Sequence, residues 1–117
     1  MQGSRLVVYK KYTNLYDYVY DITYKYPKYE RFALVQEIKK CLFIGVREIN
    51  NAVDVGNNNQ RLVHLHNLLN ELTLLKFYMR TSYRHKYISL QNYNTFSKDV
   101  TDVINMVGGM IRGCPKL

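Results

Sequence analysis

Apolar residues recur along this chain at alternating steps of three and four, which is the period of an α-helix; a strand would need every second position. The pattern breaks at Pro27, at Gly56 with the asparagines that follow it, and near Ser89. It therefore predicts four helices, over about residues 4–26, 30–55, 60–86 and 90–112.

Each predicted helix carries an apolar stripe that we expect to face a common core. The stripes are Val8, Tyr12, Leu15, Val19, Ile22 and Tyr26; Val35, Ile38, Leu42, Gly45, Ile49 and Ala52; Leu62, Leu65, Leu69 and Leu72, continuing through Lys76 to Met79 and Tyr83 with Leu68 and Leu75 beside them; and Tyr93, Phe96, Val100, Val103, Val107 and Met110. Gly45 costs up to about 1 kcal/mol of helix propensity. Its place on a stripe predicts a close helix–helix approach at that level.

Several helix ends have a local cause in the sequence. Pro27 ends the first helix, because the residue before a proline is pushed out of the helical region. Glu30 lies in the predicted first turn of the second helix, where a negative charge suits the helix dipole. Ser89 is the expected N-cap of the fourth helix, and Gly113 with Pro115 predicts its end.

Short connections predict that consecutive helices are antiparallel neighbours. The predicted fold class is therefore all-α, an antiparallel up-down four-helix bundle. The 117 residues, 47% of them hydrophobic, are enough for a single domain over residues 1–117 with a core of its own. A coiled-coil dimer is the alternative that the sustained heptads admit, and the short turns favour packing within one chain.

Catalytic and metal-binding patterns are missing from the sequence. His64 and His66 are two apart and share no helix face, His85 is distant, and no Glu-x-x-His pair exists. Cys41 and Cys114 are far apart, and Cys41 adjoins the core stripe, so a buried structural thiol is expected. We expect no metal, no cofactor and no enzymatic activity.

Positive charge is the property that speaks most directly to partners. Seventeen Lys and Arg residues against nine Asp and Glu leave a net charge of +8, which favours a polyanion as the partner. Lys76, Arg80 and Arg84 are four apart and form one ridge on the third helix, with no acid after Glu71 in that stretch. The candidate nucleic-acid-binding residues are Arg31, Lys39, Lys40, Arg47, Lys76, Arg80, Arg84 and Lys86. A solvated polar face is the alternative.

Tyrosine is concentrated at the start of the chain, where eight of the twelve lie in the first 29 residues. Tyr9, Tyr16, Tyr20 and Tyr24 fall on a second face of the first helix, beside the core stripe. Amphipathic rings on a second face predict a subunit interface; stacking on bases and compositional drift are the alternatives.

The cellular setting follows from what the sequence lacks. No run of about 18 apolar residues exists, so no membrane span is expected. The N-terminus lacks the apolar segment of a signal peptide. A reducing cytoplasm is the simplest compartment for these thiols.

Several segments, taken in order, resemble one family. YDYVYDITYKYPKYERFALVQEIKKCLF (residues 16–43) contains Tyr26-Pro27-Lys28 followed by Glu30-Arg31-Phe32; LLNELTLLKFYMR, YISLQNY and INMVGGMIR follow at similar spacing. Together they resemble the accessory variability determinant (Avd) proteins of diversity-generating retroelements, which are related to the 23S rRNA intervening-sequence proteins. The chain departs from the family pattern at Met110, where Trp is usual, and at Tyr29, where a small hydroxyl residue is common.

The resemblance implies a four-helix bundle assembled as a ring-shaped homopentamer. It also implies a non-catalytic accessory subunit that binds the reverse transcriptase, RNA and DNA during mutagenic retrohoming. The alternative is an oligomeric interaction or structural bundle of the 23S rRNA intervening-sequence type, without strong affinity for nucleic acid.

Overall fold

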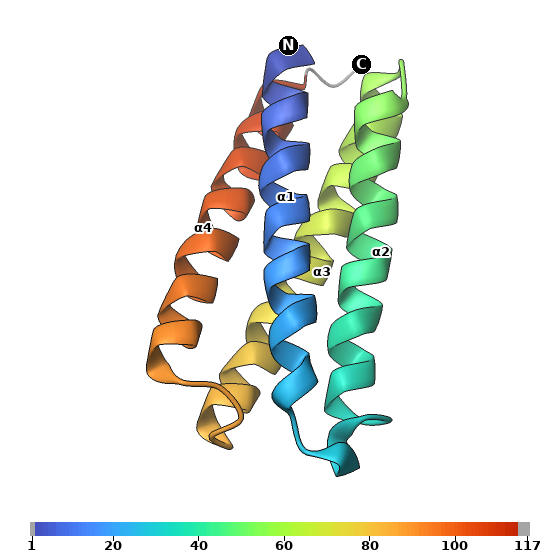
Figure 1. The fold of residues 1–117 in the computed structure, drawn as a ribbon. Coiled ribbons are helices and arrows are strands. Elements are labelled where there is room, and N and C mark those ends of the chain that lie inside the picture. Colours follow the sequence, from blue (N-terminus) through green and yellow to red (C-terminus); the bar gives the residue numbers. More distant parts are fainter. Residues whose placement is uncertain (1, 115–117) are drawn as a thin grey trace.

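The computed structural model of the chain describes the backbone of residues 2–114 and the side chains of residues 6–114. Its elements are α1 (Gln2–Ile22), the short 3-10 helices η1 (Thr23–Lys25) and η2 (Lys28–Glu30), α2 (Leu34–Asp54), α3 (Asn58–Arg84) and α4 (Leu90–Arg112). Successive α-helices run in opposite directions (Figure 1). Over the described residues the fold is therefore all-α, with the four helices that the periodicity predicted.

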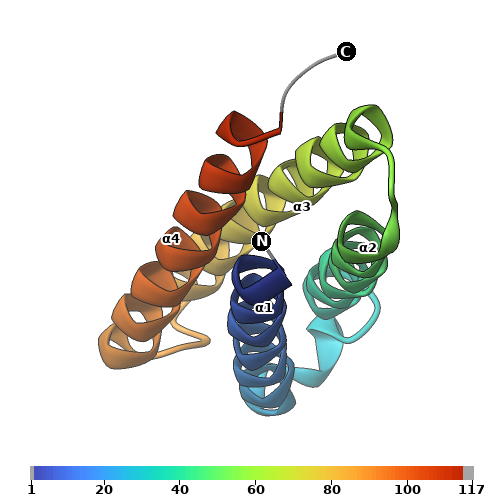
Figure 2. The ribbon, with the colours of Figure 1, turned by 90° about the horizontal axis from the view of Figure 1, so that it is seen from above.

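The helices surround a core in the cyclic order α1, α2, α3, α4. Each helix packs against the helices before and after it in the chain, and α1 also packs against α4. Figure 2 shows this arrangement along the bundle axis. The interface between α2 and α3 is the most extensive, and that between α1 and α2 the least. The turns that join α1 to α2 and α3 to α4 lie at the same end of the bundle (Figure 1).

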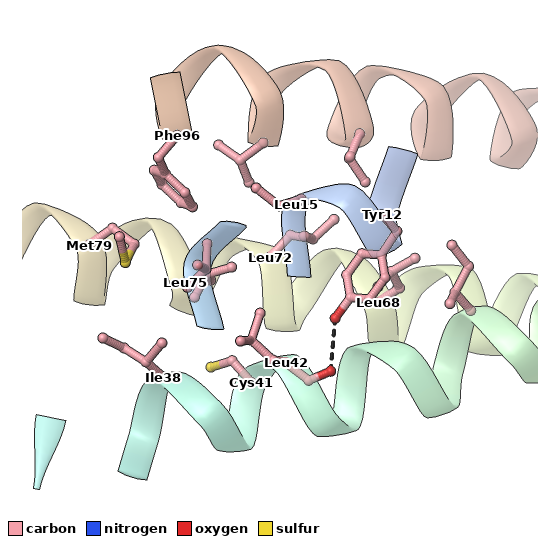
Figure 3. Packing of buried hydrophobic residues seen from close by; sticks show 14 of the residues in the cluster. Tyr12, Leu15, Ile38, Cys41, Leu42, Leu68, Leu72, Leu75, Met79 and Phe96 are labelled. Carbon is pink, nitrogen blue, oxygen red and sulfur yellow. Dashed lines mark hydrogen bonds between the residues drawn. The ribbon is translucent and has the colours of Figure 1, made fainter. Parts of the chain in front are cut away.

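The stripes predicted for α1, α2 and α4 are largely confirmed as core. Tyr12 and Leu15 of α1 meet Leu42 of α2 and Leu72 of α3 in the middle of the bundle (Figure 3). Among the predicted members of these three stripes, only Ile22, Tyr93 and Met110 are less than fully buried, and they still pack against the core.

Part of the stripe predicted for α3 lies outside the observed core. Leu65, Leu68, Leu72, Leu75, Met79 and Ser82 are buried along this helix. Leu69 is half-buried, and Lys76 and Tyr83 are exposed, so the predicted continuation through them is wrong. The predicted and observed stripes share Leu65, Leu72 and Met79. The second core row is Leu68, Leu75 and Ser82, each one position before the predicted Leu69, Lys76 and Tyr83.

The start of α2 is also corrected. Tyr26 is extended (ψ 153°), as the following proline predicted. The chain then forms η2 instead of entering the helix at Glu30, and Ala33 has a non-helical backbone (φ −123°, ψ −102°). Glu30 therefore stands before α2, where its carboxylate accepts a hydrogen bond from the Leu34 amide at 3.3 Å. It satisfies a free N–H of the first turn from outside the helix.

The side chain of Asn57 caps the start of α3, and that of Ser89 caps the start of α4. The Asn57 side chain accepts from the Gln60 amide at 3.1 Å, so α3 begins before the predicted residue 60. The Ser89 hydroxyl accepts from the Asn92 amide at 3.0 Å, which confirms the predicted N-cap. Gly113 follows α4 in a right-handed conformation (φ −83°); Pro115 lies outside the described residues.

At Gly45 the space left by the missing side chain is filled by the Tyr12 ring of α1, so a side-chain contact stands where a close approach of two helices was predicted. The Tyr12 hydroxyl lies 2.1 Å from where a Cβ on Gly45 would stand. It donates a hydrogen bond to the Leu42 carbonyl at 2.9 Å, shown as the dashed line in Figure 3. Gly45 therefore makes room for a buried polar contact between α1 and α2.

Candidate nucleic-acid interface

All eight basic residues predicted to bind nucleic acid have solvent access. Seven are exposed, and Lys39 is half-buried. The structure brings some of them together and separates others, because α2 and α3 present different faces to solvent. Six of them form one group at the turn between α1 and α2 and a second group on α3, and Arg47 and Lys86 belong to neither.

The first group surrounds what we call the turn cleft, two adjoining hollows that share Arg31, Val35 and Lys39. Their volumes are about 330 and 360 Å³. Lys28 borders one hollow and Lys40 the other. The remaining lining residues are Thr23, Tyr24, Tyr26, Pro27, Phe32, Gln36 and Phe43. None of the lining residues is acidic.

An aromatic ring on α1 positions Lys39. The Lys39 ammonium lies 4.5 Å from the centre of the Tyr20 ring, in a cation–π contact. Tyr20 in turn stacks on Tyr16, with ring centres 5.9 Å apart, and Tyr16 contacts Phe43 of α2 at 6.4 Å. Lys39 is thus held between the two hollows by a ladder of rings that fills the α1–α2 groove.

The second group is the basic ridge, formed by Lys76, Arg80 and Arg84 on α3. Tyr83, two turns from Lys76 along the same helix side, stacks on Tyr93 of α4 with ring centres 4.9 Å apart. The helical period places Lys76 and Arg80 on this α4 side. The ridge and the turn cleft therefore lie on different faces of the bundle, and they do not form one continuous site.

Arg47 and Lys86 stand apart from both groups. Arg47 lies two turns beyond Lys40 on α2 and does not border the turn cleft. Lys86 follows α3 with a positive φ of 64°. The Lys86 amide bonds to the Tyr83 carbonyl and the Tyr87 amide to the Ser82 carbonyl, which together form a Schellman motif.

The exposed basic residues are not neutralised by carboxylates. Over residues 6–114, the ion pair within 4.0 Å is His64–Glu48, which contains no Lys or Arg. Residues 17–40 and 76–93, around the two turns at one end, hold nine of the 17 basic and four of the nine acidic residues. This end of the bundle therefore carries more than half of the net charge.

A hydrogen-bonded chain of side chains links the two turns at that end. Tyr87 donates to the Glu30 carboxylate at 2.8 Å, and the Tyr29 and Tyr87 hydroxyls lie 3.2 Å apart. Hydrogen bonds to Tyr29 and then to Glu30 raise the pKa of Tyr87 above its usual range. Because Glu30 accepts from Tyr87 and from Leu34, its charge is already engaged on the side of the α3–α4 turn.

The four tyrosines predicted at a subunit interface have different surroundings. Tyr16 and Tyr20 are half-buried within the chain by the ring ladder described above. Tyr9 is 36% exposed and Tyr24 84% exposed. Tyr24 is therefore the one of the four that is open to a partner over most of its side chain, and the interface itself stays a prediction.

Cys41 and His64 both lie in contacts between helices. Cys41 is buried, as expected, and burial raises the pKa of its thiol to about 12. His64 Nδ1 lies 2.6 Å from the Glu48 carboxylate across the α2–α3 interface. Among the described residues, no three His, Cys, Asp or Glu side chains are placed to share a metal ion. No helix in that part of the chain is long and apolar enough to cross a membrane.

Two residues that border the turn cleft went unrecognised in the sequence. Lys28 and Phe32 border the turn cleft, and the alternation of aromatic and basic residues from Tyr24 to Phe32 could have indicated them. Arg61, by contrast, is only 5% exposed. Its guanidinium donates to the Ala52 carbonyl at 3.0 Å and also to the Val55 carbonyl, so it caps the end of α2 and does not belong to the basic surface.

A comparison with known protein families identifies the family of this chain. The model of the bAvd-like family matches residues 6–114, nearly the whole chain. The chain belongs to the bAvd-like family. This confirms the resemblance found in the ordered motifs. No functionally curated protein is a significant match to this bAvd-like chain.

A solved structure supports the fold of this bAvd-like protein. It is a protein of unknown function of the S23 ribosomal protein family from Bacteroides thetaiotaomicron. The two share 16% sequence identity with a TM-score of 0.82, and the alignment covers 93% of this chain and 98% of that one. At this identity the likeness concerns the four-helix fold alone.

Proposed function

We propose that this bAvd-like protein is a non-catalytic accessory subunit of a diversity-generating retroelement that binds the reverse transcriptase and the template RNA or its cDNA. Family membership supports the retroelement setting. The observation that carries the nucleic-acid part is the unneutralised positive charge at the end with the two turns. Arg31, Lys40, Arg80 and Arg84 are exposed there, without a carboxylate within 4.0 Å among the described side chains.

Binding of nucleic acid through such residues should depend strongly on salt concentration. Each phosphate contact releases condensed counterions, so the logarithm of the association constant falls linearly with the logarithm of salt concentration. The slope is about −0.7 per neutralised phosphate for a single strand and about −0.9 for duplex DNA. A fluorescein-labelled RNA titrated at several salt concentrations, with anisotropy as the readout, therefore counts the contacts.

Charge reversal locates them. We expect Arg80→Glu/Arg84→Glu and, separately, Arg31→Glu/Lys40→Glu to weaken RNA binding and to flatten the salt slope. Lys10→Glu/Lys98→Glu is the matched control, since it changes the net charge equally at exposed positions outside the two groups. If all three variants weaken binding to the same extent, the effect is one of net charge. If the wild-type chain binds neither RNA nor DNA, the nucleic-acid role is wrong.

Binding to the reverse transcriptase needs its own test. Co-expression of the chain with a reverse transcriptase of a diversity-generating retroelement, followed by affinity purification under high salt, should recover a stoichiometric complex. High salt removes bridging through RNA, because phosphate contacts are salt-sensitive. Recovery only at low salt, and its loss after nuclease treatment, would attribute the association to nucleic acid.

A second candidate is an oligomeric interaction bundle without strong affinity for nucleic acid. It is favoured by apolar side chains on the outer face of α3, where Val63, Leu74 and Phe77 are 57%, 44% and 64% exposed. Such a patch is typical of a protein–protein interface. We propose a homo-oligomer, and from the family resemblance a pentamer. Light scattering after size-exclusion chromatography tests this, with Leu74→Glu/Phe77→Glu expected to reduce the assembly.

A further inference from the structure

The turn cleft combines two properties that are rarely found together on a solvent-exposed surface. Tyr24 is 84% and Phe32 81% exposed, the highest values among the large apolar residues with described side chains. They border the two hollows from opposite ends of the α1–α2 turn. An apolar ring left this open favours a partner that covers it, because water is a poor environment for such a surface.

The charge of the cleft restricts what that partner can be. Lys28, Arg31, Lys39 and Lys40 border it, and no carboxylate does. Of the acids beside the lining residues in the sequence, Glu30 accepts from Tyr87, Glu37 is half-buried, and Asp21 is exposed; none of the three borders either hollow. The occupant must therefore be anionic and must offer flat surfaces to the rings.

Single-stranded nucleic acid meets both conditions. Its phosphates suit the guanidinium and ammonium groups, and its unstacked bases can lie against aromatic rings. A duplex hides its base faces inside the helix, so it can use the charges but not the rings. Hollows of about 330 and 360 Å³ fall in the size range of small-ligand sites, which suits individual nucleotides.

The cleft is also held in shape before any ligand arrives. Tyr20 fixes the Lys39 ammonium from one side. The contact between the Tyr29 and Tyr87 hydroxyls ties the turn to the α3–α4 connection. Preorganised groups lose less freedom on binding, so a short strand can bind without refolding the turn.

We propose that the turn cleft binds single-stranded nucleic acid, with bases stacked on Tyr24 and Phe32 and phosphates held by Lys28, Arg31 and Lys39. This proposal rests on the proposed nucleic-acid role and adds to it a strand preference and a location. It assigns stacking to the α1–α2 turn and leaves the basic ridge as a surface for phosphates alone.

The test uses the full-length chain and three fluorescein-labelled probes of equal length: oligothymidylate, an abasic strand, and a blunt duplex. Wild-type protein should bind oligothymidylate most tightly. Tyr24→Ala/Phe32→Ala should weaken that binding by about tenfold or more, while binding of the abasic strand and the duplex stays unchanged. Tyr24→Phe/Phe32→Tyr, which keeps both rings, should retain the wild-type affinity.

Arg31→Ala/Lys39→Ala should weaken binding of all three probes and reduce the salt slope, because it removes phosphate contacts. Leu6→Ala/Leu90→Ala is the matched control for loss of exposed apolar surface, since these residues are 64% and 57% exposed and border neither hollow. Helicity measured by circular dichroism should be unchanged in every variant, because Tyr24 and Phe32 are mostly exposed.

Three results would overturn the proposal. The first is wild-type affinity for oligothymidylate in Tyr24→Ala/Phe32→Ala; if Arg80→Glu/Arg84→Glu still weakens RNA binding, the general nucleic-acid role stands without the cleft. The second is that wild-type protein binds the abasic strand as tightly as oligothymidylate, which would mean that the rings do not contribute to binding. The third is that Tyr24→Ala/Phe32→Ala changes only the oligomeric state or the recovery of the reverse transcriptase, which assigns the cleft to a protein. A wild-type chain that binds no probe contradicts both proposals together.

Discussion

The hydroxyl of Tyr12 on α1 occupies the space that a side chain at Gly45 on α2 would need. Tyr12 is 1% exposed and is hydrogen-bonded to the Leu42 carbonyl. This large buried side chain therefore joins two helices through a polar contact in the middle of the core. The missing Cβ of Gly45 makes the contact possible, which explains a glycine in the interior of a helix.

We expect Gly45→Ala to destabilise the protein by about 1–3 kcal/mol, although alanine is the better helix former. The new Cβ would lie 2.1 Å from the Tyr12 hydroxyl and 2.8 Å from the ring carbon that bears it. Urea denaturation followed by circular dichroism measures the free energy of unfolding. Tyr12→Phe combined with Gly45→Ala should recover part of the loss, since the nearest atom is then gone.

The matched control for this substitution is Gly109→Ala on α4. A Cβ there would meet only the end of the Arg112 side chain at 3.8 Å. Its effect should therefore be the propensity gain, up to about 1 kcal/mol in favour of folding. A Gly45→Ala protein as stable as wild type would show that Tyr12 can move without cost.

Periodicity predicted the parts of the fold that depend on the burial of apolar side chains. The predicted stripe of α2, from Val35 to Ala52, is buried at every position. Periodicity did not predict where α2 begins, because a local hydrogen bond determines that boundary: Glu30, in the preceding turn, accepts from the Leu34 amide. On α3 the same period fits two adjacent rows of residues, and the prediction placed the exposed Lys76 on the stripe where the core uses the neighbouring Leu75.

The candidate site was predictable in composition but not in shape. Sequence spacing placed Lys40 on one face of the second helix with Arg47, Lys39 beside them and Arg31 near the helix start. It could not show that they border hollows shared with Tyr24 and Phe32, because those hollows form where a non-helical turn folds beside α2. Nor could spacing show that Arg61 is buried among carbonyl groups, since the end of α2 and the start of α3 meet only in three dimensions.

Lys86 occupies a backbone position that favours glycine. Its φ of 64° lies in the left-handed region, which costs a residue with a Cβ about 1–2 kcal/mol. We therefore expect Lys86→Gly to stabilise the protein by about 1 kcal/mol, measured as a higher thermal midpoint. Lys86→Ala removes the same charge but keeps the Cβ, so it should not produce this gain. An equal gain in both variants would trace the effect to charge.

Alkaline pH should destabilise the folded chain through its buried acids. Burial raises the pKa of Cys41 to about 12 and that of Tyr26 to about 12, and it raises the pKa of Tyr12 further. The folded state therefore holds these protons more tightly than the unfolded state. Their contribution to stability is complete below the ordinary thiol value of 9.0 and is lost as pH rises toward about 12, with a slope of up to about 1.4 kcal/mol per pH unit for each group.

Replacing one of these acids identifies its share of the effect. Cys41→Ala should be less stable than wild type near neutral pH because it leaves a cavity. Its free energy of unfolding should fall less steeply between about pH 9 and pH 10, where Cys41 is the first of the three to titrate in the unfolded chain. Urea titrations across this range give both slopes, and parallel slopes would contradict a role for the thiol.

Arg61 should matter for stability and not for nucleic acid. It is 5% exposed, and it donates to the Ala52 carbonyl at 3.0 Å and to Asn58 Oδ1 at 2.9 Å. Arg61→Met would leave carbonyl groups at the end of α2 without their donor, at a cost of about 1–3 kcal/mol. Arg47→Met, at an exposed position of the same charge, should change stability by less than about 0.5 kcal/mol. Because the Arg61 guanidinium points into the protein, Arg61→Met should keep the RNA affinity of the wild-type chain under conditions in which it is folded. A loss of RNA affinity in folded Arg61→Met would mean that this guanidinium is available to phosphate after all.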